Sequence, residues 1–364
     1  MKVSRFFSLA IFALAVWGVP GEARAQIADM LSMDSDGYRV VAPGRRFSFP
    51  EDHGAHNGYR IEWWYVTATL NGADGEQYGV QWTLFRSLLA PEDESVKNTP
   101  SKRGEAWRSP YMFMAHSALT SRTQHHSAER FARAGVGQAG VVASPTRIWL
   151  DDWVFEASGD NLDRARVAAG GDNFSYDLNL HADGPLVFHG DKGFSVKAPS
   201  GQASYYYSQP HYAVSGTLNI NGKEVAVTGD AWLDREWSSQ LLARSQQGWD
   251  WFSIRFDDDS KLMAFRLRDE EAGDYFSASL ISADGKLESL GPEGIRFTPL
   301  RYVRLGQRRA PVRWRIEIPS YGIDLKTSPL NPDSWMNTSF PYWEGPISIS
   351  GTHDGVGYLE MTGY

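Results

Sequence analysis

The chain has 364 residues, enough for two domains or one large one, and contains no cysteine, which rules out a disulfide framework and a lipid-anchored cysteine. Its formal net charge of −8 argues against nucleic acid or an anionic membrane surface as the main partner. The 14 Trp, 16 Tyr and 18 Phe indicate large apolar cores or a dedicated apolar pocket.

The N-terminal 25 residues are predicted to be a secretory signal peptide. Lys2 and Arg5 precede the apolar run 6–19, and Ala23-Arg24-Ala25 has the form of a cleavage site. The apolar run is too short for a stable membrane span, and no later stretch approaches the required length. We therefore expect cleavage after Ala25 and a periplasmic or secreted protein. Residues 26–46 lack clear periodicity and are expected to form an N-terminal lead-in.

The stretch 60–70 is predicted to be a strand because it is rich in aromatic and β-branched residues and is followed by turn residues. Its even-numbered side chains, from Glu62 to Leu70, share one face. Pairing Leu70 with Tyr78 of the next run places Glu62 opposite Arg86 at the end of an apolar face. The same register pairs Val66 with Trp82 and Trp64 with Leu84.

The chain from residue 91 to 228 continues this pattern. Residues 91–110 are polar and are expected to form a long connection, and a short helix is expected over 128–134. Short strands with turn signals are predicted at 111–120, 147–156, 174–181, 186–188, 205–207, 211–220 and 223–228. The dipeptide Asn221-Gly222 is a strong hairpin signal between the last two.

A second block of strands begins near Gly229. Segments 248–256 and 261–268 flank a turn at 257–260, and pairing Phe256 with Lys261 would place Trp251 opposite Arg266. Trp249 would then face Arg268, and Asp250 would face Leu267. Further strands are predicted at 275–282, 312–318, 323–327, 347–351 and 355–361. Because helical periodicity is scarce, we predict an all-β protein of antiparallel barrels or sandwiches.

Four carboxylic acids lie next to tryptophans in these strands and are candidate proton donors. Burial among apolar neighbours raises the pKa of a carboxylic acid and allows it to donate a proton near neutral pH. The alternative role is a buried ion pair that fixes the packing of the strands. The candidate catalytic residues are Glu62, Asp234, Glu236 and Asp250. Such chemistry requires no metal or organic cofactor.

His53 and His56, near Glu62, are a weaker alternative as ligands of a zinc ion. Their His-x-x-His spacing lies on a loop, so we expect a structural role and no metal site. The chain has no Gly-x-Ser-x-Gly nucleophile motif and no phosphate-binding or dinucleotide-binding pattern.

Several motifs resemble the AttH / carotenoid 1,2-hydratase family of two-domain, lipocalin-like proteins. They are Phe49-Pro50-x-Asp52-His53-Gly54-x-His56, Glu62-Trp63-Trp64-Tyr65, Trp232-Leu233-Asp234-Arg235-Glu236-Trp237-Ser238, Gly248-Trp249-Asp250-Trp251-Phe252, Tyr342-Trp343-Glu344-Gly345-Pro346 and Gly357-Tyr358-Leu359-Glu360-Met361-Thr362-Gly363-Tyr364. The resemblance implies two calycin-like antiparallel β-barrel domains packed together with little helix, at 47–235 and 236–364. Members of the family include isoprenoid hydratases, pericyclase-like enzymes, predicted secreted hydrolases and companions of ABC transporters.

The residues and the resemblance together leave two main hypotheses. The first is an exported lipocalin-like protein that binds an apolar small molecule or lipid, as an accessory of an ABC transporter. The second is a cofactor-free hydratase or lyase acting on an isoprenoid-like double bond; a secreted hydrolase and a purely structural interaction protein are further options. The candidate ligand-binding residues are Trp64, Tyr65, Trp82, Arg86, Trp232, Trp237, Trp249 and Trp251.

Overall fold

The structure is a computed structural model that describes residues 35–91, 109–240 and 242–364. The predicted signal peptide (residues 1–25), its cleavage site, part of the predicted lead-in and most of the predicted connection 91–110 lie outside these residues. Within the described part, no helix is long and apolar enough to cross a membrane.

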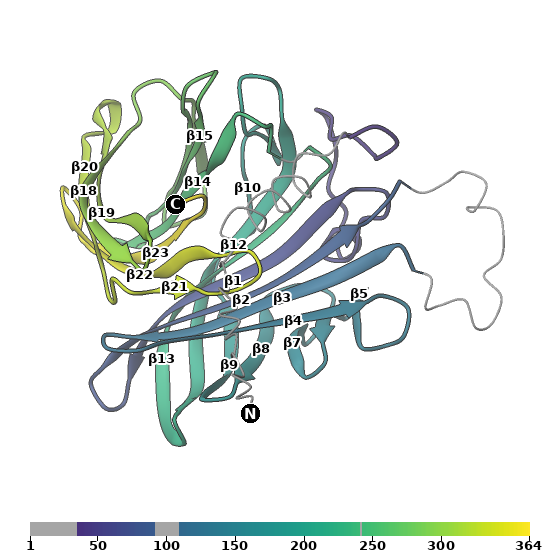
Figure 1. Ribbon diagram of the computed structural model, residues 1–364, viewed down its shortest axis with the longest axis horizontal. Coiled ribbons are helices and arrows are strands. Elements are labelled where there is room, and N and C mark those ends of the chain that lie inside the picture. Colours follow the sequence, from purple (N-terminus) through teal and green to yellow (C-terminus); the bar gives the residue numbers. More distant parts are fainter. Residues whose placement is uncertain (1–34, 92–108, 241) are drawn as a thin grey trace, which may run out of the picture.

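The described residues form an all-β protein of two antiparallel sheets, which confirms the predicted fold class (Figure 1). The large, 13-stranded sheet curls into a near-closed barrel in the order β4-β3-β2-β1-β13-β12-β9-β8-β7-β6-β5, with β10 and β11 paired to β12. Its strands are β1 (Ile61–Gly72), β2 (Gln77–Leu88), β3 (Tyr111–Ser121), β4 (His125–Arg133), β5 (Ala139–Ala143), β6 (Thr146–Leu150), β7 (Trp153–Ala157), β8 (Arg164–Gly171), β9 (Phe174–Ala182), β10 (Val187–Phe188), β11 (Phe194–Val196), β12 (Ala203–Ile220) and β13 (Lys223–Ser238).

The small, 10-stranded sheet is a half-barrel in the order β17-β16-β15-β14-β23-β22-β20-β19-β18, with β21 paired to β22. Its strands are β14 (Gln246–Phe256), β15 (Lys261–Asp269), β16 (Tyr275–Ile281), β17 (Leu287–Leu290), β18 (Arg296–Leu305), β19 (Arg308–Ile318), β20 (Ile323–Pro329), β21 (Trp335–Met336), β22 (Tyr342–Gly351) and β23 (Gly355–Met361). The described helical segments are two short 3-10 turns, Glu51–His53 and Pro319–Tyr321. The chain passes from the large sheet to the small one between Ser238 and Gln246.

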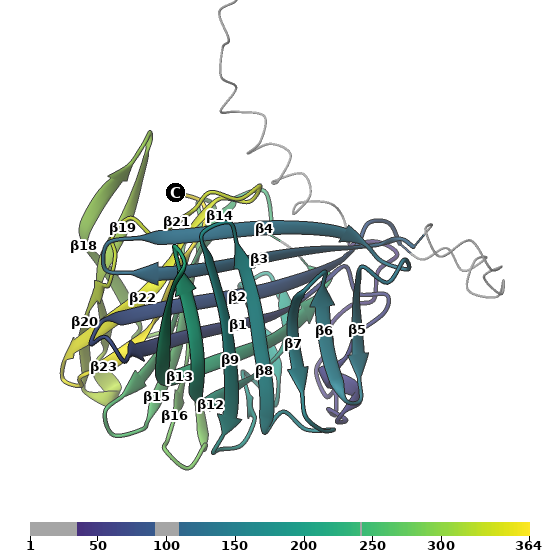
Figure 2. The same cartoon turned by 90° about the horizontal axis from the view of Figure 1, so that it is seen from below.

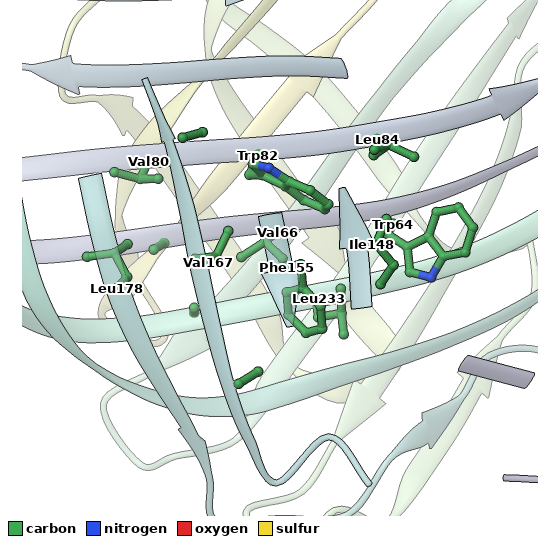
Figure 3. Packing of buried hydrophobic residues seen from close by; sticks show 14 of the residues in the cluster. Trp64, Val66, Val80, Trp82, Leu84, Ile148, Phe155, Val167, Leu178 and Leu233 are labelled. Atoms are coloured by element: carbon green, nitrogen blue, oxygen red, sulfur yellow. The ribbon is translucent and has the colours of Figure 1, made fainter. Parts of the chain in front are cut away.

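Aromatic and branched side chains fill the interior of the large sheet (Figure 3). Trp82 of β2, Trp153 of β7 and Phe155 of β7 have no exposed surface, so no water-sized space adjoins these rings. They pack with Val66 of β1 and Ile148 of β6, which also have no exposed surface. The middle of this barrel is therefore a packed core in which side chains occupy the space.

The predicted register of the first hairpin is confirmed. Leu70 lies opposite Tyr78 and Glu62 lies opposite Arg86, as alternation and the turn residues at 71–75 indicated. Strand β9 likewise alternates between buried and exposed side chains along Phe174–Ala182, as predicted for a half-solvated antiparallel strand.

The predicted register of the β14–β15 hairpin is wrong by one residue. Arg255, and not Phe256, lies opposite Lys261, because the loop has three residues and ends with Asp259 in the left-handed region at φ 65°. Asp250 therefore lies opposite Arg266 instead of Leu267. The predicted cation–π pairs of Trp249 and Trp251 with arginines of β15 do not form, since these tryptophans lie opposite Leu267 and Phe265.

The predicted helix over 128–134 is also wrong, because residues 128–133 belong to strand β4. Strand β4 is the edge of the large sheet, and most of its side chains are partly exposed on both faces. Its sequence therefore lacks the clear alternation that identifies a half-buried strand.

The two sheets pack against each other through their central strands, and in both views the small sheet lies beside β1, β2 and β13 (Figures 1 and 2). Strand β2 contacts β22, and β1 contacts β23. A Cβ atom on Gly79 of β2 would lie 2.5 Å from Cγ of Pro346 and 2.9 Å from the hydroxyl of Tyr358. The absence of a side chain at Gly79 thus permits the close approach of the sheets.

Replacing Gly79 with Val is expected to lower the free energy of unfolding by about 1–3 kcal/mol, because the side chain would force apart a well-packed contact. The matched control is Gly291→Val, since Gly291 is exposed and a Cβ atom there would meet nothing within 4 Å. Urea denaturation of both variants checks the prediction. Equal stability of the two variants would show that the sheets do not pack tightly at Gly79.

Candidate functional site

Alternation directs every second side chain of the central strands away from each sheet's own core and toward the other sheet. We call the resulting set the inter-sheet layer. Its buried apolar members come from both sheets and include Tyr65, Val187, Tyr206, Trp232, Trp251, Met263, Phe265 and Tyr358, with the half-buried Trp249 packed against them. Of the four described carboxylic acids whose pKa is raised, three lie in this layer, namely Asp234, Glu344 and Glu360.

Asp234 of β13 is the central carboxylic acid of the inter-sheet layer. The Tyr206 hydroxyl donates a hydrogen bond of 2.6 Å to Oδ2, and the Trp232 indole N–H donates one of 2.6 Å to Oδ1. The Ser208 hydroxyl also donates to Oδ1. Within the described part of the chain, no Lys or Arg forms an ion pair with Asp234. Burial therefore raises the pKa of Asp234 to about 7, although the three donors oppose the shift.

A chain of hydrogen bonds leads from Asp234 to the small sheet. Nε2 of His189 lies 2.7 Å from the Ser208 hydroxyl, and Nδ1 lies 2.9 Å from the hydroxyl of Ser279 on β16. Burial, reinforced by the charge of Lys197, lowers the pKa of His189 well below its usual value, so the ring is neutral. A neutral imidazole accepts a proton at one nitrogen while donating at the other. This arrangement can return a proton to Asp234.

The small sheet contributes a pair of carboxylic acids to the same layer. Glu344 of β22 and Glu360 of β23 lie directly opposite each other, and neither points into the core of the small sheet. The Tyr65 hydroxyl donates to Glu344, and the Trp249 indole donates a hydrogen bond of 2.7 Å to Glu360. Burial raises the pKa of Glu344 well above its usual value. Burial and the nearby charge of Asp234 raise the pKa of Glu360 to about 7.

His116 of β3 connects this pair toward the surface. Its Nδ1 lies 3.0 Å from the hydroxyl of Tyr342, a residue of the same face of β22 as Glu344. Its Nε2 lies 3.0 Å from Oε1 of Glu129, whose side chain is 16% exposed. His116 itself has no exposed surface, so its ring links a partly solvated carboxylate to a buried tyrosine.

Glu236 also faces the inter-sheet layer but is ion-paired. The Lys197 ammonium lies 3.0 Å from Oε1 of Glu236 and 4.4 Å from the centre of the Tyr206 ring. Lys197 therefore places one positive charge beside the aromatic side chains of the layer. A pocket of about 130 Å³ lies between residues of β12 and β13 and residues of β14 and β15. It is lined by charged side chains such as Asp230 and Lys261.

Glu62 lies in a different place, at the end of the large barrel, where it is a buried anion. The Arg86 guanidinium lies 2.6 Å from Oε1, and the Arg235 guanidinium donates to Oε2. The backbone N–H of His56 donates to both oxygens. Although burial opposes ionisation, the two arginines and His56 together lower the pKa of Glu62 to about 2. Glu62 is therefore ionised at neutral pH and cannot serve as a proton donor.

Asp250 points into the core of the small sheet, away from the inter-sheet layer. Oδ2 of Asp250 lies 2.6 Å from the Arg266 guanidinium, and the Tyr364 hydroxyl donates a hydrogen bond of 2.8 Å to Oδ1. Asp250 thus forms a buried ion pair that neutralises Arg266 inside the core. Of the four candidate acids, Asp234 and Glu236 share a layer, whereas Glu62 and Asp250 lie elsewhere.

The two loop histidines have separate partners. Nδ1 of His53 lies 2.7 Å from the Tyr207 hydroxyl, whereas Nε2 of His56 lies 2.9 Å from Oδ1 of Asp52. The His56 ring also stacks on Trp237, with ring centres 3.7 Å apart. Among the described residues, no group of three or more His, Asp or Glu side chains is arranged to hold a metal ion.

The candidate ligand-binding residues divide into two sets. Tyr65, Trp232, Trp249 and Trp251 gather in the inter-sheet layer around Asp234 and Glu360. Trp64, Trp82, Trp237 and Arg86 lie inside the large barrel or at its end, where Arg86 pairs with Glu62 and the three tryptophans are at most 2% exposed.

The predicted site residues do not include Tyr206 and Ser208, which donate to Asp234, or His189, which contacts Ser208. They also do not include Glu344 and Glu360 of the small sheet. Alternation could have identified part of this set. In Tyr342-Trp343-Glu344, the acid shares a face with Tyr342, whereas Trp343 points into the small sheet's core. In the same way, Glu360 lies on the face opposite to the core residue Leu359. A buried strand with an acid on its second face indicates that this face is buried against another sheet.

Comparison with known proteins gives three results. A protein-family model described as AttH-like matches residues 40–364. A solved structure assigned to AttH from Nitrosomonas europaea is 35% identical, covers 90% of this chain and 99% of its own, and superposes with a TM-score of 0.78. Kievitone hydratase from Nectria haematococca is 17% identical, with 90% and 96% coverage and a TM-score of 0.66, which shows a common fold. None of the curated proteins matches the chain.

Proposed function

The chain belongs to the AttH-like family, and on that basis we propose that it is an enzyme that adds water to, or removes water from, a carbon–carbon double bond of an apolar, isoprenoid-like substrate. The observation that carries the proposal is Asp234, a fully buried acid whose pKa is raised to about 7 and which has no cationic partner among the described residues. Kievitone hydratase, which shares the fold, is by its name a hydratase.

The proposed reaction begins with transfer of the Asp234 proton to one carbon of the double bond, which leaves a carbocation on the other carbon. The faces of Trp232 and Trp251, whose ring centres lie 6.5 Å apart, would stabilise this positive charge through their quadrupoles. Water then forms the new carbon–oxygen bond and gives its surplus proton to Glu360. A carboxyl with a pKa near 7 can act as either acid or base at neutral pH.

The hydrogen bonds around Asp234 support this role. Ser208 and His189 form a path by which a proton can return to Asp234 after each turnover. When water is removed, Glu360 donates a proton to the departing hydroxyl group, and the Asp234 carboxylate accepts the proton that is lost from carbon. All of these groups are side chains of the protein, so the proposed chemistry requires no metal or organic cofactor.

The second candidate is a binding protein that carries an apolar small molecule or lipid. The gathering of Tyr65, Trp232, Trp249 and Trp251 on one layer favours it, because aromatic side chains with few polar groups are typical of apolar ligand sites. Export to the periplasm and an ABC transporter as partner remain predictions from the N-terminal sequence and the family resemblance.

Incubation of the purified protein with a panel of acyclic isoprenoid alkenes in ¹⁸O-labelled water tests the proposal. We expect mass spectrometry to detect a product heavier than its substrate by one molecule of labelled water, and the corresponding alcohols to lose water in the reverse direction. The carrier hypothesis predicts the opposite outcome, in which an apolar compound stays bound to the protein and leaves without any incorporated label.

A further inference from the structure

The hairpin formed by β18 and β19 concentrates positive charge in an otherwise acidic chain. Residues 294–316 contain seven arginines and no acidic residue, whereas the whole chain has a formal net charge of −8. We call this segment the arginine hairpin; its arginines are Arg296, Arg301, Arg304, Arg308, Arg309, Arg313 and Arg315. Strand β18 is the edge of the small sheet, and in both views the hairpin lies on the side of that sheet away from the large sheet (Figures 1 and 2).

The arginines of this hairpin oppose one another. Arg301 lies directly opposite Arg313, and Arg304 lies directly opposite Arg309. Like charges in directly opposite positions destabilise a sheet. Of the seven arginines, Arg315 alone forms an ion pair with another described residue, at 2.7 Å from Asp324 and 3.2 Å from Glu317. Arg313 donates to the Thr327 carbonyl, and Arg308 lies over the Trp335 ring. The other four arginines, Arg296, Arg301, Arg304 and Arg309, are exposed and are thus available to an anion from outside the protein.

Protection of an exposed sheet edge does not account for this arrangement. Charged side chains on an edge strand prevent pairing with other chains. Of the four arginines of β19, Arg315 lies where the strand is paired with both β18 and β20, whereas the other three lie where it is paired with β18 alone. Edge protection does not require like charges in directly opposite positions, as in the pairs Arg301–Arg313 and Arg304–Arg309.

Large apolar side chains are exposed among the arginines. Leu300 is 47% exposed and Tyr302 is 42% exposed. The Arg309 guanidinium lies 4.1 Å from the centre of the Tyr302 ring. Surfaces that combine cationic with aromatic or aliphatic side chains are typical of proteins that lie at the membrane–water interface.

We propose that the arginine hairpin binds the phosphate groups of an anionic lipid bilayer, with Leu300 and Tyr302 inserted among the headgroups. Each guanidinium can donate two parallel hydrogen bonds to a phosphate. The net negative charge of the rest of the chain would orient the protein, because an anionic surface repels that remaining charge and attracts the arginine hairpin. Nucleic acid is a less suitable partner, since the exposed Leu300 would gain nothing from a phosphate backbone.

Co-sedimentation of the full-length protein with vesicles tests this proposal. Vesicles of phosphatidylcholine with about 30 mol % phosphatidylglycerol are compared with pure phosphatidylcholine vesicles at about 50 mM salt, where screening is weak. We expect binding to the anionic vesicles alone, and its loss as the salt concentration rises. The triple variant Arg301→Glu/Arg304→Glu/Arg309→Glu is expected to partition at least about a hundredfold less, at about fivefold for each positive charge removed.

The matched control is Arg122→Glu/Arg133→Glu/Arg164→Glu, which reverses three exposed arginines of the large sheet and should bind nearly as well as the wild type. Circular dichroism checks that both variants fold. Equal binding of the two triple variants, equal binding to neutral vesicles, or no binding to anionic vesicles would overturn the proposal. Tighter binding of a short DNA duplex than of the vesicles would also overturn it and would assign the arginine hairpin to polyanions in general.

Discussion

Replacement of Asp234 with Asn is expected to lower the turnover number of the proposed hydration about 10²- to 10⁴-fold, the usual contribution of a general acid. Asn has the same shape and still accepts hydrogen bonds at Oδ1 from Ser208 and Trp232, but it has no carboxyl proton to donate. The Michaelis constant should change little. Steady-state kinetics with the alkene identified by the labelled-water experiment measure both quantities.

The same substitution has a second expected result, in the pH dependence of stability. The pKa of Asp234 is raised from its ordinary value of 3.8 to about 7 in the folded protein. The protonated carboxyl therefore contributes stability that is complete below pH 3.8 and is lost as the pH rises through 7. The loss amounts to about 4 kcal/mol. Asp234→Asn should therefore be at least as stable as the wild type at pH 8, and the decline of stability between pH 4 and pH 7 should become shallower.

The matched control is Asp250→Asn. Asp250 is also buried, but it neutralises Arg266 in the core of the small sheet. Its substitution should lower the free energy of unfolding, whereas the folded fraction should retain its turnover number. Full activity of Asp234→Asn, or loss of stability equal to that of Asp250→Asn, would assign Asp234 a purely structural role.

Replacement of Glu62 with Gln is expected to lower the free energy of unfolding by about 3–5 kcal/mol at pH 7, because it leaves buried positive charge without its partner. Arg235 has no exposed surface and Arg86 is 8% exposed, so water cannot compensate either guanidinium. Urea denaturation measures the change. The control Glu156→Gln disrupts an exposed ion pair with Arg166 and should cost less than about 1 kcal/mol.

The effect of Glu62→Gln should depend on pH in a defined direction. The pKa of Glu62 is lowered from 4.5 to about 2, so its ionisation contributes stability that is complete above pH 4.5 and is lost as the pH falls through 2. This contribution is about 3 kcal/mol. The difference between wild type and variant should accordingly shrink as the pH falls toward 2. A difference below 1 kcal/mol at pH 7 would contradict the buried ion pair.

Adjacent residues of β13 show why three of the four candidate acids differ, namely Glu62, Asp234 and Glu236. Arg235 points into the large barrel, where its positive charge keeps Glu62 ionised. Asp234 and Glu236 point to the inter-sheet layer, where Lys197 pairs with Glu236. Asp234 accepts hydrogen bonds from three neutral donors, Tyr206, Ser208 and Trp232. The distribution of three cations (Arg86, Arg235 and Lys197) thus leaves one acid of the segment protonated near neutral pH.

Local patterns in the sequence were sufficient for the β1–β2 register and for most of the central strands, but they did not identify β4, β5, β8, β11, β17, β18 or β21. A strand's two faces are set by alternation, and the short turn at 71–75 joins β1 directly to β2, so Glu62 could be placed opposite Arg86 from neighbouring residues alone. The β14–β15 register needed one further fact, the left-handed conformation of Asp259, which the sequence pattern does not specify.

The tertiary structure alone decided which of the four candidate acids has a pKa of about 7. The pKa of a buried carboxyl depends on the charges and donors within hydrogen-bonding distance, and those partners come from distant segments. Tyr206 and Ser208 belong to β12, and Glu344 and Glu360 belong to the other sheet, more than 100 residues away along the chain. Alternation specifies the face on which Asp234 lies, but only the packing of the two sheets removes water from that face.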